Sequence, residues 1–181
     1  TKPANNGAPV NTVLILCSRI SPEEQQTYVK ELITRAGFKG LKLQQPSNTF
    51  NIRANPVFNP KDGQALETFL QKEKANSKGS LLVLAILESG SPYYGFLKRT
   101  AETKFGLVSQ CAEGAKIRKN IRNGKNLSGY LDNINLKINV KLGGENYSLK
   151  PSKPANNRIL TTYPDANPSG PFSSTVPVMV V

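Results

Sequence analysis

The sequence contains no histidine, no tryptophan, one methionine and only two cysteines among its 181 residues. Without histidine, the chain cannot build a Cys₂His₂ zinc site, a histidine-dependent catalytic triad or a haem site with a histidine ligand. Two cysteines are too few for a Cys₄ zinc site or a disulfide-rich scaffold, and such a low number is typical of a reducing compartment. These absences exclude several common classes of enzyme and of extracellular domain.

Long hydrophobic runs are also missing. The longest apolar run, LLVLAIL at 81–87, is far shorter than the roughly 20 residues that a membrane span needs. The first ten residues are polar and do not resemble a secretory signal peptide. We therefore expect one domain of ordinary size, without a membrane segment and located in the cytoplasm. Thr1 in place of Met and the apolar residues 176–181 lead us to expect a piece of a longer chain.

Acidic residues are scarce relative to basic ones. The chain carries 24 Lys and Arg against 12 Asp and Glu, a formal net charge of +12, and its isoelectric point is about 9.8. Residues 91–153 hold twelve of the basic residues and only four acids. A basic surface of this kind indicates a polyanionic partner, most often a nucleic acid. A basic protein without such a partner remains the alternative.

The hydrophobic pattern predicts strands that alternate with helices. Strand-length apolar runs lie at 12–17, 41–43, 81–87 and 105–109, and helical patterns at 22–36, 60–74 and 92–104. Residues 46–59 read as a loop, and residues 112–129 as a loop or a mobile helix start. This alternation predicts an α/β fold with an open, mostly parallel sheet flanked by helices. Ligands of such sheets bind outside the carboxyl ends of the strands.

The segment 127–142 is ambiguous. Its apolar residues alternate strictly from 134 to 142, which is typical of a strand, but others fall at helical spacing. The pattern alone slightly favours a strand. Beyond 145 the chain is polar and rich in proline, and the apolar residues 175–181 predict a strand. Neither a GxxxxGK[ST] nor a GxGxxG phosphate-binding motif occurs.

A few polar residues stand at positions that suggest a binding site. Tyr94 and Lys98 are four residues apart, as are Lys137 and Lys141, and Gln110 follows a predicted strand. A spacing of four places two side chains on one face of either a helix or a strand. A tyrosine ring can stack on a base, lysines can bind a phosphate, and a glutamine can donate a hydrogen bond. The simpler alternative is a set of ordinary surface lysines and a packed tyrosine.

Two segments resemble a known family. They are SPYYGFLKRTAETKFGLVSQC at Ser91–Cys111 and LKINVKLGG at Leu136–Gly144, and both closely resemble the MID domain of eukaryotic Argonaute proteins. The SQC string and the long loops are most similar to a fungal, quelling-type member. The resemblance implies a Rossmann-like MID fold in which LKINVKLGG is helical. It also implies a MID domain at 12–144 and a linker with the first strand of a PIWI domain at 145–181, and the polar residues 1–11 that precede them predict a flexible lead.

The function that the resemblance implies is binding of the 5′-phosphorylated terminal nucleotide of a guide small RNA in RNA silencing. The expected partners are the 5′ end of an siRNA-like guide and the PIWI domain of the same parent chain, with no cofactor. The residues that match the family's 5′-phosphate site are Tyr94, Lys98, Gln110, Cys111, Lys137 and Lys141. The residues that match its base-reading loop are Glu88, Ser89, Gly90, Ser91, Pro92 and Tyr93.

The same resemblance implies that the chain is a binding module and not an enzyme. The slicer residues of the family belong to PIWI, as does an arginine that completes the phosphate site. We therefore expect no nuclease activity and a weaker phosphate site than that of the parent protein. Two other classes stay open: a Rossmann-type enzyme with a nucleotide cofactor, against which the missing GxGxxG and histidine count, and a general polyanion-binding domain without end recognition.

Overall fold

The computed structural model describes residues 2–123, 127–147, 160–162 and 178–180. The chain divides into two compact units, residues 1–148 and 149–181. The first unit contains a parallel four-stranded sheet of order β2-β1-β3-β4. Its strands are β1 (Val10–Cys17), β2 (Leu43–Asn51), β3 (Leu81–Leu87) and β4 (Val108–Glu113). Its helices are α1 (Pro22–Phe38), α2 (Pro60–Asn76), α3 (Tyr93–Lys98), α4 (Gly114–Arg122) and α5 (Ser128–Lys141).

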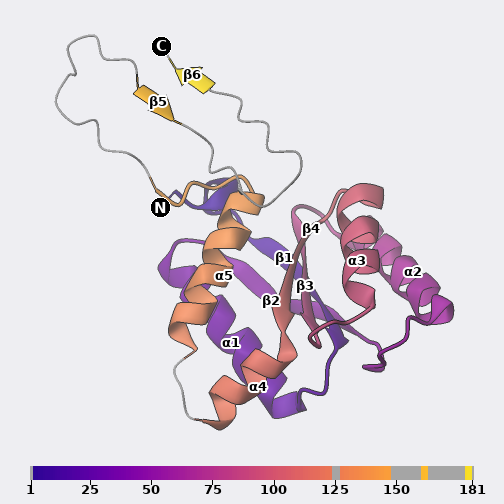
Figure 1. The fold of residues 1–181 in the computed structure, drawn as a ribbon. Helices are drawn as coiled ribbons and strands as arrows, with labels where there is room; N and C mark the ends of the chain where they lie inside the picture. Colours follow the sequence, from indigo (N-terminus) through magenta and orange to yellow (C-terminus); the bar gives the residue numbers. More distant parts are fainter. Residues whose placement is uncertain (1, 124–126, 148–159, 163–177, 181) are drawn as a thin grey trace. The chain divides into compact units, whose positions relative to one another are not determined.

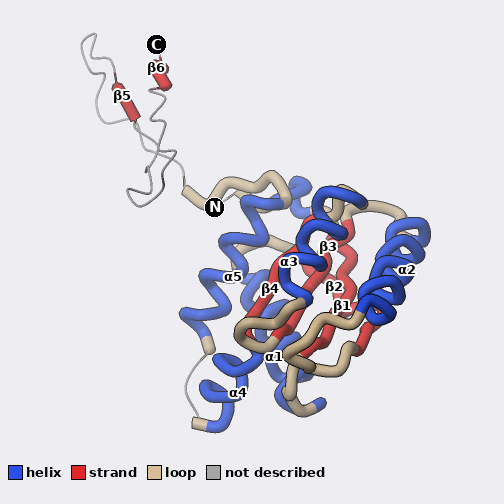
Figure 2. The backbone as a smooth tube through the Cα atoms, turned by 45° about the vertical axis from the view of Figure 1, so that its right-hand side comes forward, coloured by secondary structure: helices blue, strands red, loops and turns tan. Residues whose placement is uncertain are grey.

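The helices form a layer on each face of this sheet. Helices α1, α4 and α5 cover one face, and α2 and α3 cover the other, as the two views in Figure 1 and Figure 2 show. Side chains of β1 alternate between the two cores: Leu14 and Leu16 pack in one, and Val13 and Ile15 in the other. Strands β1 and β3 are buried on both faces, which explains their uninterrupted apolar runs. The predicted α/β fold with a mostly parallel sheet is confirmed.

Helix α1 begins at the capping signal that the sequence predicts. The Ser21 hydroxyl accepts a hydrogen bond from the Glu24 amide at 3.2 Å, and the Glu24 carboxylate accepts one from the Ser21 amide at 2.9 Å. Pro22 occupies the first helical position, where its missing N–H is not needed. This reciprocal pair satisfies two amide donors that the helix itself cannot.

The ambiguous segment 127–142 is helical, as the family resemblance implied and against the alternation of its apolar residues. Leu131, Ile134 and Ile138 on one face of α5 are buried in the core on the α1 side. Val140, which belongs to the alternating set, is 54% exposed. A helix explains both observations, because its buried stripe follows a period of 3.6 residues and not of two.

Several predicted boundaries are wrong. Strand β2 runs through residues 43–51, so the first part of the predicted loop at 46–59 is a strand. Pro46 is tolerated there because β2 lies at an edge of the sheet and its register shifts near this residue. Strand β4 begins at Val108 instead of residue 105 and runs to Glu113. Gln110 therefore lies inside this strand and not after it.

The regions on either side of β4 also differ from the prediction. The expected helix at 92–104 is split, because α3 ends at Lys98 and a π-helix, η2 (Arg99–Lys104), follows it. The segment 112–129, predicted as a loop or a mobile helix start, contains the nine-residue helix α4. Both differences concern short helices, in which the hydrophobic pattern repeats too few times to predict the helix and its bounds.

The amino-terminal segment, predicted to be a flexible lead at 1–11, contains regular structure. Residues Ala4–Gly7 form a 3₁₀ helix, and β1 begins at Val10. The buried Ala4 amide donates to the Asn139 side-chain oxygen at 2.9 Å. The Lys2 amide donates to the Glu145 carbonyl at 2.7 Å. These contacts attach the segment to the end of α5 and to the residues that follow it.

The second unit contains an antiparallel pair, β5 (Leu160–Thr162) and β6 (Val178–Val180). Strand β6 lies within the strand predicted at 175–181, and the sequence did not predict β5. The remainder of the predicted linker, residues 148–159 and 163–177, lies outside the described residues. Within the described ranges, no helix is both long enough and apolar enough to cross a membrane.

Candidate nucleotide-binding site

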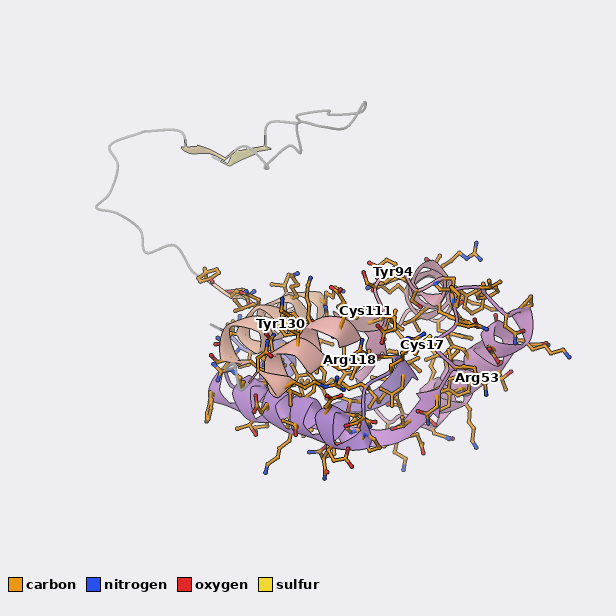
Figure 3. The ribbon with its side chains drawn as sticks, turned by 60° about the horizontal axis from the view of Figure 1, so that its bottom comes forward. Cys17, Arg53, Tyr94, Cys111, Arg118 and Tyr130 are labelled. Carbon is orange, nitrogen blue, oxygen red and sulfur yellow. The ribbon has the colours of Figure 1, made fainter. Side chains whose placement is uncertain are left out.

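A cavity of about 440 Å³ opens at the carboxyl ends of β3 and β4. Its lining residues come from the ends of both strands, the loop after β3 and the start of α3: Leu87, Glu88, Ser89, Gly90, Ser91, Tyr94, Cys111, Ala112 and Glu113. Figure 3 shows Tyr94 and Cys111 near each other at this end of the domain. The carboxyl edge of a parallel sheet is where α/β domains hold their ligands.

The two adjacent tyrosines of α3 have different surroundings. The Tyr93 ring is fully buried, and its hydroxyl donates to Asp62 at 3.0 Å and accepts from the Asn59 amide at 3.1 Å. Tyr93 therefore ties α3 to the start of α2, and its side chain does not line the cavity. Tyr94 is 53% exposed and lines the cavity. Its ring is available for stacking.

Two of the predicted phosphate-binding lysines meet at the edge of β4. The ammonium groups of Lys98 on α3 and Lys141 on α5 both donate to the Ser109 carbonyl, at 3.2 Å and 2.7 Å. Strand β4 is an edge strand of the sheet, so this carbonyl is open to side-chain donors. The fold thus concentrates two positive charges around one oxygen, although their residues lie far apart in the sequence.

A carboxylate completes this lysine cluster. The Glu102 side chain, from the π-helix η2, lies 2.7 Å from the Lys98 ammonium and 3.8 Å from that of Lys141. The buried Ser109 hydroxyl donates to the same carboxylate oxygen at 2.9 Å. π-Helical turns are rare and often mark functional sites. We name Lys98, Glu102, Ser109 and Lys141 the lysine cluster; its Glu102 and Ser109 were not among the predicted site residues.

The charges of the lysine cluster influence one another. Burial lowers the pKa of Lys141, and the neighbouring Lys98 charge lowers it further. Burial is the largest single influence on Lys98 and acts to lower its pKa, but the hydrogen bonds with Glu102 and Lys141 and the nearby negative charges together outweigh it, so the pKa is raised overall. Lys141 is therefore the member that releases its proton first as the pH rises. A bound anion would favour its charged form.

The other predicted phosphate-binding residues, Lys137, Gln110 and Cys111, do not donate side-chain hydrogen bonds to the Ser109 carbonyl. The exposed side chain of Lys137 lies one turn before Lys141 on α5 and makes none of the hydrogen bonds around Ser109. The Gln110 amide nitrogen donates to the Cys111 carbonyl at 2.9 Å, and its buried side-chain oxygen has no hydrogen-bond partner among the described residues. Burial raises the pKa of the Cys111 thiol, so it favours the neutral form. Gln110 thus presents an acceptor, and its amide would have to turn to donate to a phosphate.

The predicted base-reading loop is only partly at the cavity. Glu88, Ser89, Gly90 and Ser91 line it, whereas Pro92 lines a neighbouring cavity. Across residues 2–123, 127–147, 160–162 and 178–180, no group of three or more His, Cys, Asp and Glu side chains is placed to hold a metal ion. The arrangement is suited to binding a planar ring beside an anion.

Comparison with known proteins agrees with this geometry. Residues 81–162 match the family described as the Piwi domain. Protein argonaute 5 of Arabidopsis thaliana is 32% identical over 162 residues, which are 88% of this chain and 15% of that protein. The chain therefore spans about 15% of the length of this curated relative.

Solved structures show the same fold. The crystal structure of the Arabidopsis thaliana AGO5 MID domain matches with a TM-score of 0.63 and 29% identity, over 82% of this chain and 100% of that domain. The structure of Kluyveromyces polysporus Argonaute with a guide RNA matches with a TM-score of 0.59 and 18% identity, over 82% of this chain and 18% of the other. At that lower identity, the similarity concerns the fold alone.

The fold and the site define an α/β domain with a cavity of about 440 Å³ at the carboxyl edge of its sheet and a lysine cluster that begins two residues before Cys111 on β4. The similarity to a plant MID domain over its entire length, together with the Piwi match, supports an Argonaute MID domain. The finer expectation of a fungal, quelling-type member is not confirmed, because the MID structure and the curated relative described above come from a plant.

Proposed function

We propose that the chain binds the 5′-phosphorylated terminal nucleotide of a guide small RNA, as the MID domain of an Argonaute in RNA silencing. The observation that carries this proposal is the convergence of Lys98 and Lys141 on the Ser109 carbonyl, next to a cavity lined by Tyr94. Support comes from the Kluyveromyces polysporus Argonaute structure, which holds a guide RNA and shares the fold.

The distance between the cavity with Tyr94 and the lysine cluster suits one nucleotide. Tyr94 and Lys98 are one helical turn apart, about 6 Å along the axis of a helix. Cys111 in the cavity and Ser109 in the lysine cluster are two residues apart on β4, about 7 Å. Because Tyr94 and Cys111 line one cavity and Lys98 binds the Ser109 carbonyl, a base beside Tyr94 can carry its phosphate toward the lysine cluster.

The charge of the lysine cluster favours a terminal phosphate. A phosphate monoester carries about −1.5 to −2 near neutral pH, whereas an internal phosphodiester carries about −1. Two adjacent ammonium groups attract the more highly charged ligand more strongly, and screening by salt should weaken this attraction. Stacking of the first base on Tyr94 adds about 1–3 kcal/mol and works for any base.

The proposal extends to the partners and the setting of the domain. The guide is siRNA-like, the PIWI domain of the same parent chain adjoins the site, and the protein acts in the cytoplasm. The chain itself is a binding module without catalytic residues. The fungal, quelling-type assignment also remains part of the proposal, on the strength of the SQC string and the long loops.

Titration of UMP and uridine against the 181-residue chain tests this function. We expect UMP to bind at least about tenfold more tightly, because each hydrogen bond to a charged group contributes about 1.5–3 kcal/mol. Equal affinity for UMP and uridine would rule the proposal out. A general polyanion-binding domain would instead bind 5′-phosphorylated and 5′-hydroxyl RNA oligonucleotides equally well.

A further inference from the structure

The loop Glu88–Ser91 is a wall between two cavities. On one side lies the 440 Å³ cavity with Tyr94. On the other side lies a second cavity of about 320 Å³, whose far wall includes Cys17, Arg19 and Arg118. All four residues of the loop line both cavities. A wall with open space on both sides depends on the few contacts that hold it.

Backbone contacts fix the two ends of this loop. The Glu88 amide donates to the Cys17 carbonyl at 3.0 Å, and the Ser91 amide donates to the Glu88 carbonyl at 3.1 Å. Between them the chain turns at Gly90, whose φ of +69° is a left-handed conformation that favours glycine. Two side chains join the loop to the rest of the domain: the Ser91 hydroxyl lies 3.8 Å from the Cys17 thiol, and Glu88 makes the more numerous contacts.

The Glu88 carboxylate binds three groups from two other segments. One oxygen accepts from the Ser18 hydroxyl at 3.0 Å, from the Arg19 amide at 2.8 Å and from Arg118 at 2.5 Å. The other oxygen accepts from the second terminal nitrogen of Arg118 at 3.1 Å. The Arg118 hydrogen bond is the main cause that lowers the pKa of Glu88 to about 2. The side chains of Arg118 and Glu88 are 19% and 24% exposed, so solvent screens this pair only in part.

A glycine allows α4 to supply this arginine. Gly114 is the first residue of α4, and a Cβ added there would lie 2.0 Å from the Ser18 hydroxyl. Because glycine has no side chain, α4 packs closely on the end of β1, and Arg118, one turn further on, reaches Glu88. Figure 3 shows Arg118 and Cys17 at this end of the domain.

The Arg118–Glu88 pair lies where the connections of the sheet diverge. Strand β1 leads to α1 on one face, and the adjacent β3 leads to α3 on the opposite face. Such a divergence leaves a crevice at the carboxyl ends of the two strands, where doubly wound sheets commonly bind anions. In this chain a carboxylate of the protein itself takes the place of such an anion.

We propose that Arg118 is a positioning residue that fixes the loop Glu88–Ser91 through Glu88 and thereby sets discrimination among the four nucleobases. This inference rests on the proposed function. The lysine cluster provides phosphate affinity from a different set of elements. Loss of Arg118 should therefore alter base selectivity and leave phosphate binding unchanged.

The test is the affinity of the 181-residue chain and its variants for UMP, AMP, CMP, GMP and ribose 5-phosphate. For the unmodified chain we expect the four nucleotides to differ by about threefold or more, the size of one hydrogen bond. In Arg118→Ala this spread should shrink to less than about twofold, with ribose 5-phosphate binding retained. The matched control is Arg122→Ala, because Arg122 lies one turn further along α4 and pairs with Glu24 at 2.8 Å. This control should keep the full spread.

Three results would overturn the inference: four equal affinities in the unmodified chain, an unchanged spread in Arg118→Ala, or a parallel loss of ribose 5-phosphate binding in that variant. If Arg118→Ala fails to fold, as judged by circular dichroism, Glu88→Gln replaces it with the same expected loss of spread. Failure of the proposed function is separately visible, since UMP would then bind no better than uridine.

Discussion

The phosphate end and the base end of the candidate site are held in different ways. At the phosphate end, α3, η2, β4 and α5 all contribute to the lysine cluster, in which hydrogen bonds to the Glu102 carboxylate and the Ser109 carbonyl join all four residues. At the base end, a loop with a cavity on each side is held by backbone contacts at its ends and by side-chain contacts that come mainly from the carboxylate of Glu88.

This difference separates two properties of binding. Side chains already held in place lose little freedom when a ligand binds, so the phosphate end is suited to provide affinity. A loop with open space on both sides can adopt slightly different positions, so the base end is suited to provide selectivity. The comparison predicts that substitutions at the two ends change different measured quantities.

The largest effect should come from the lysine cluster. Lys98→Ala or Lys141→Ala removes a charged donor, and we expect UMP affinity to fall by about 10- to 150-fold. Isothermal titration calorimetry at low salt measures the change. The matched control is Lys104→Ala, because Lys104 lies on η2 next to this region but pairs with Glu67. Normal UMP binding by both cluster variants would place the phosphate elsewhere.

Loss of the exposed ring should have the next largest effect. Tyr94→Ala removes base stacking, worth about 1–3 kcal/mol, and should weaken UMP binding by about tenfold. Ribose 5-phosphate has no base, so its affinity should not change. Tyr94→Phe keeps the ring and serves as the control for stacking. A tenfold loss in Tyr94→Phe as well would indicate that the hydroxyl, and not the ring, makes the contact.

Removal of the carboxylate in the lysine cluster should change the pH dependence of binding. In Glu102→Gln, Lys98 and Lys141 face each other without a counter-charge, and the nearby thiol of Cys111 is neutral near pH 7. The pKa of Lys141, already lowered by burial and by Lys98, should therefore fall further. UMP affinity measured between pH 6 and 10 should decline at a lower pH than in the unmodified chain. Identical pH profiles would show that Glu102 does not control the lysine charges.

The smallest effect concerns stability at the base end. The pKa of Glu88 is about 2 in the folded chain, compared with an ordinary value of 4.5. Its ion pair therefore stabilises the fold above pH 4.5, and this contribution is lost as the pH falls toward 2. At pH 6, Glu88→Gln should lower the melting temperature by a few degrees, which corresponds to the loss of a partly exposed ion pair. Near pH 2 the same substitution should have no effect. A difference that stays constant with pH would contradict this reading.

Local signals in the sequence predict much of the fold. Strand β3 matches its predicted bounds, because seven consecutive apolar residues are typical of a strand buried on both faces. The start of α1 follows from its capping residues. The helix α5 could not be predicted from its pattern, because Val140 extends the apolar alternation and yet lies on the surface. Other apolar residues at helical spacing left a helix open, and the resemblance of LKINVKLGG to a known family decided for it.

The site is less accessible to prediction because its contacts join distant parts of the chain. The spacing of Tyr94 and Lys98 indicated that both could serve one ligand. Nothing in the sequence indicated that Lys141 shares the Ser109 carbonyl with Lys98, or that Arg118 binds Glu88 thirty residues away. Glu102 resembles an ordinary helical ion-pair partner of Lys98, and a π-helix has no clear sequence signal.

A crystal structure of the 181-residue chain soaked with UMP would locate both ends of the bound nucleotide at once. We expect the phosphate within hydrogen-bond distance of the Lys98 and Lys141 ammonium groups and the uracil ring against Tyr94. A phosphate beside Arg118 in the second cavity, or a base that does not contact Tyr94, would contradict this expectation.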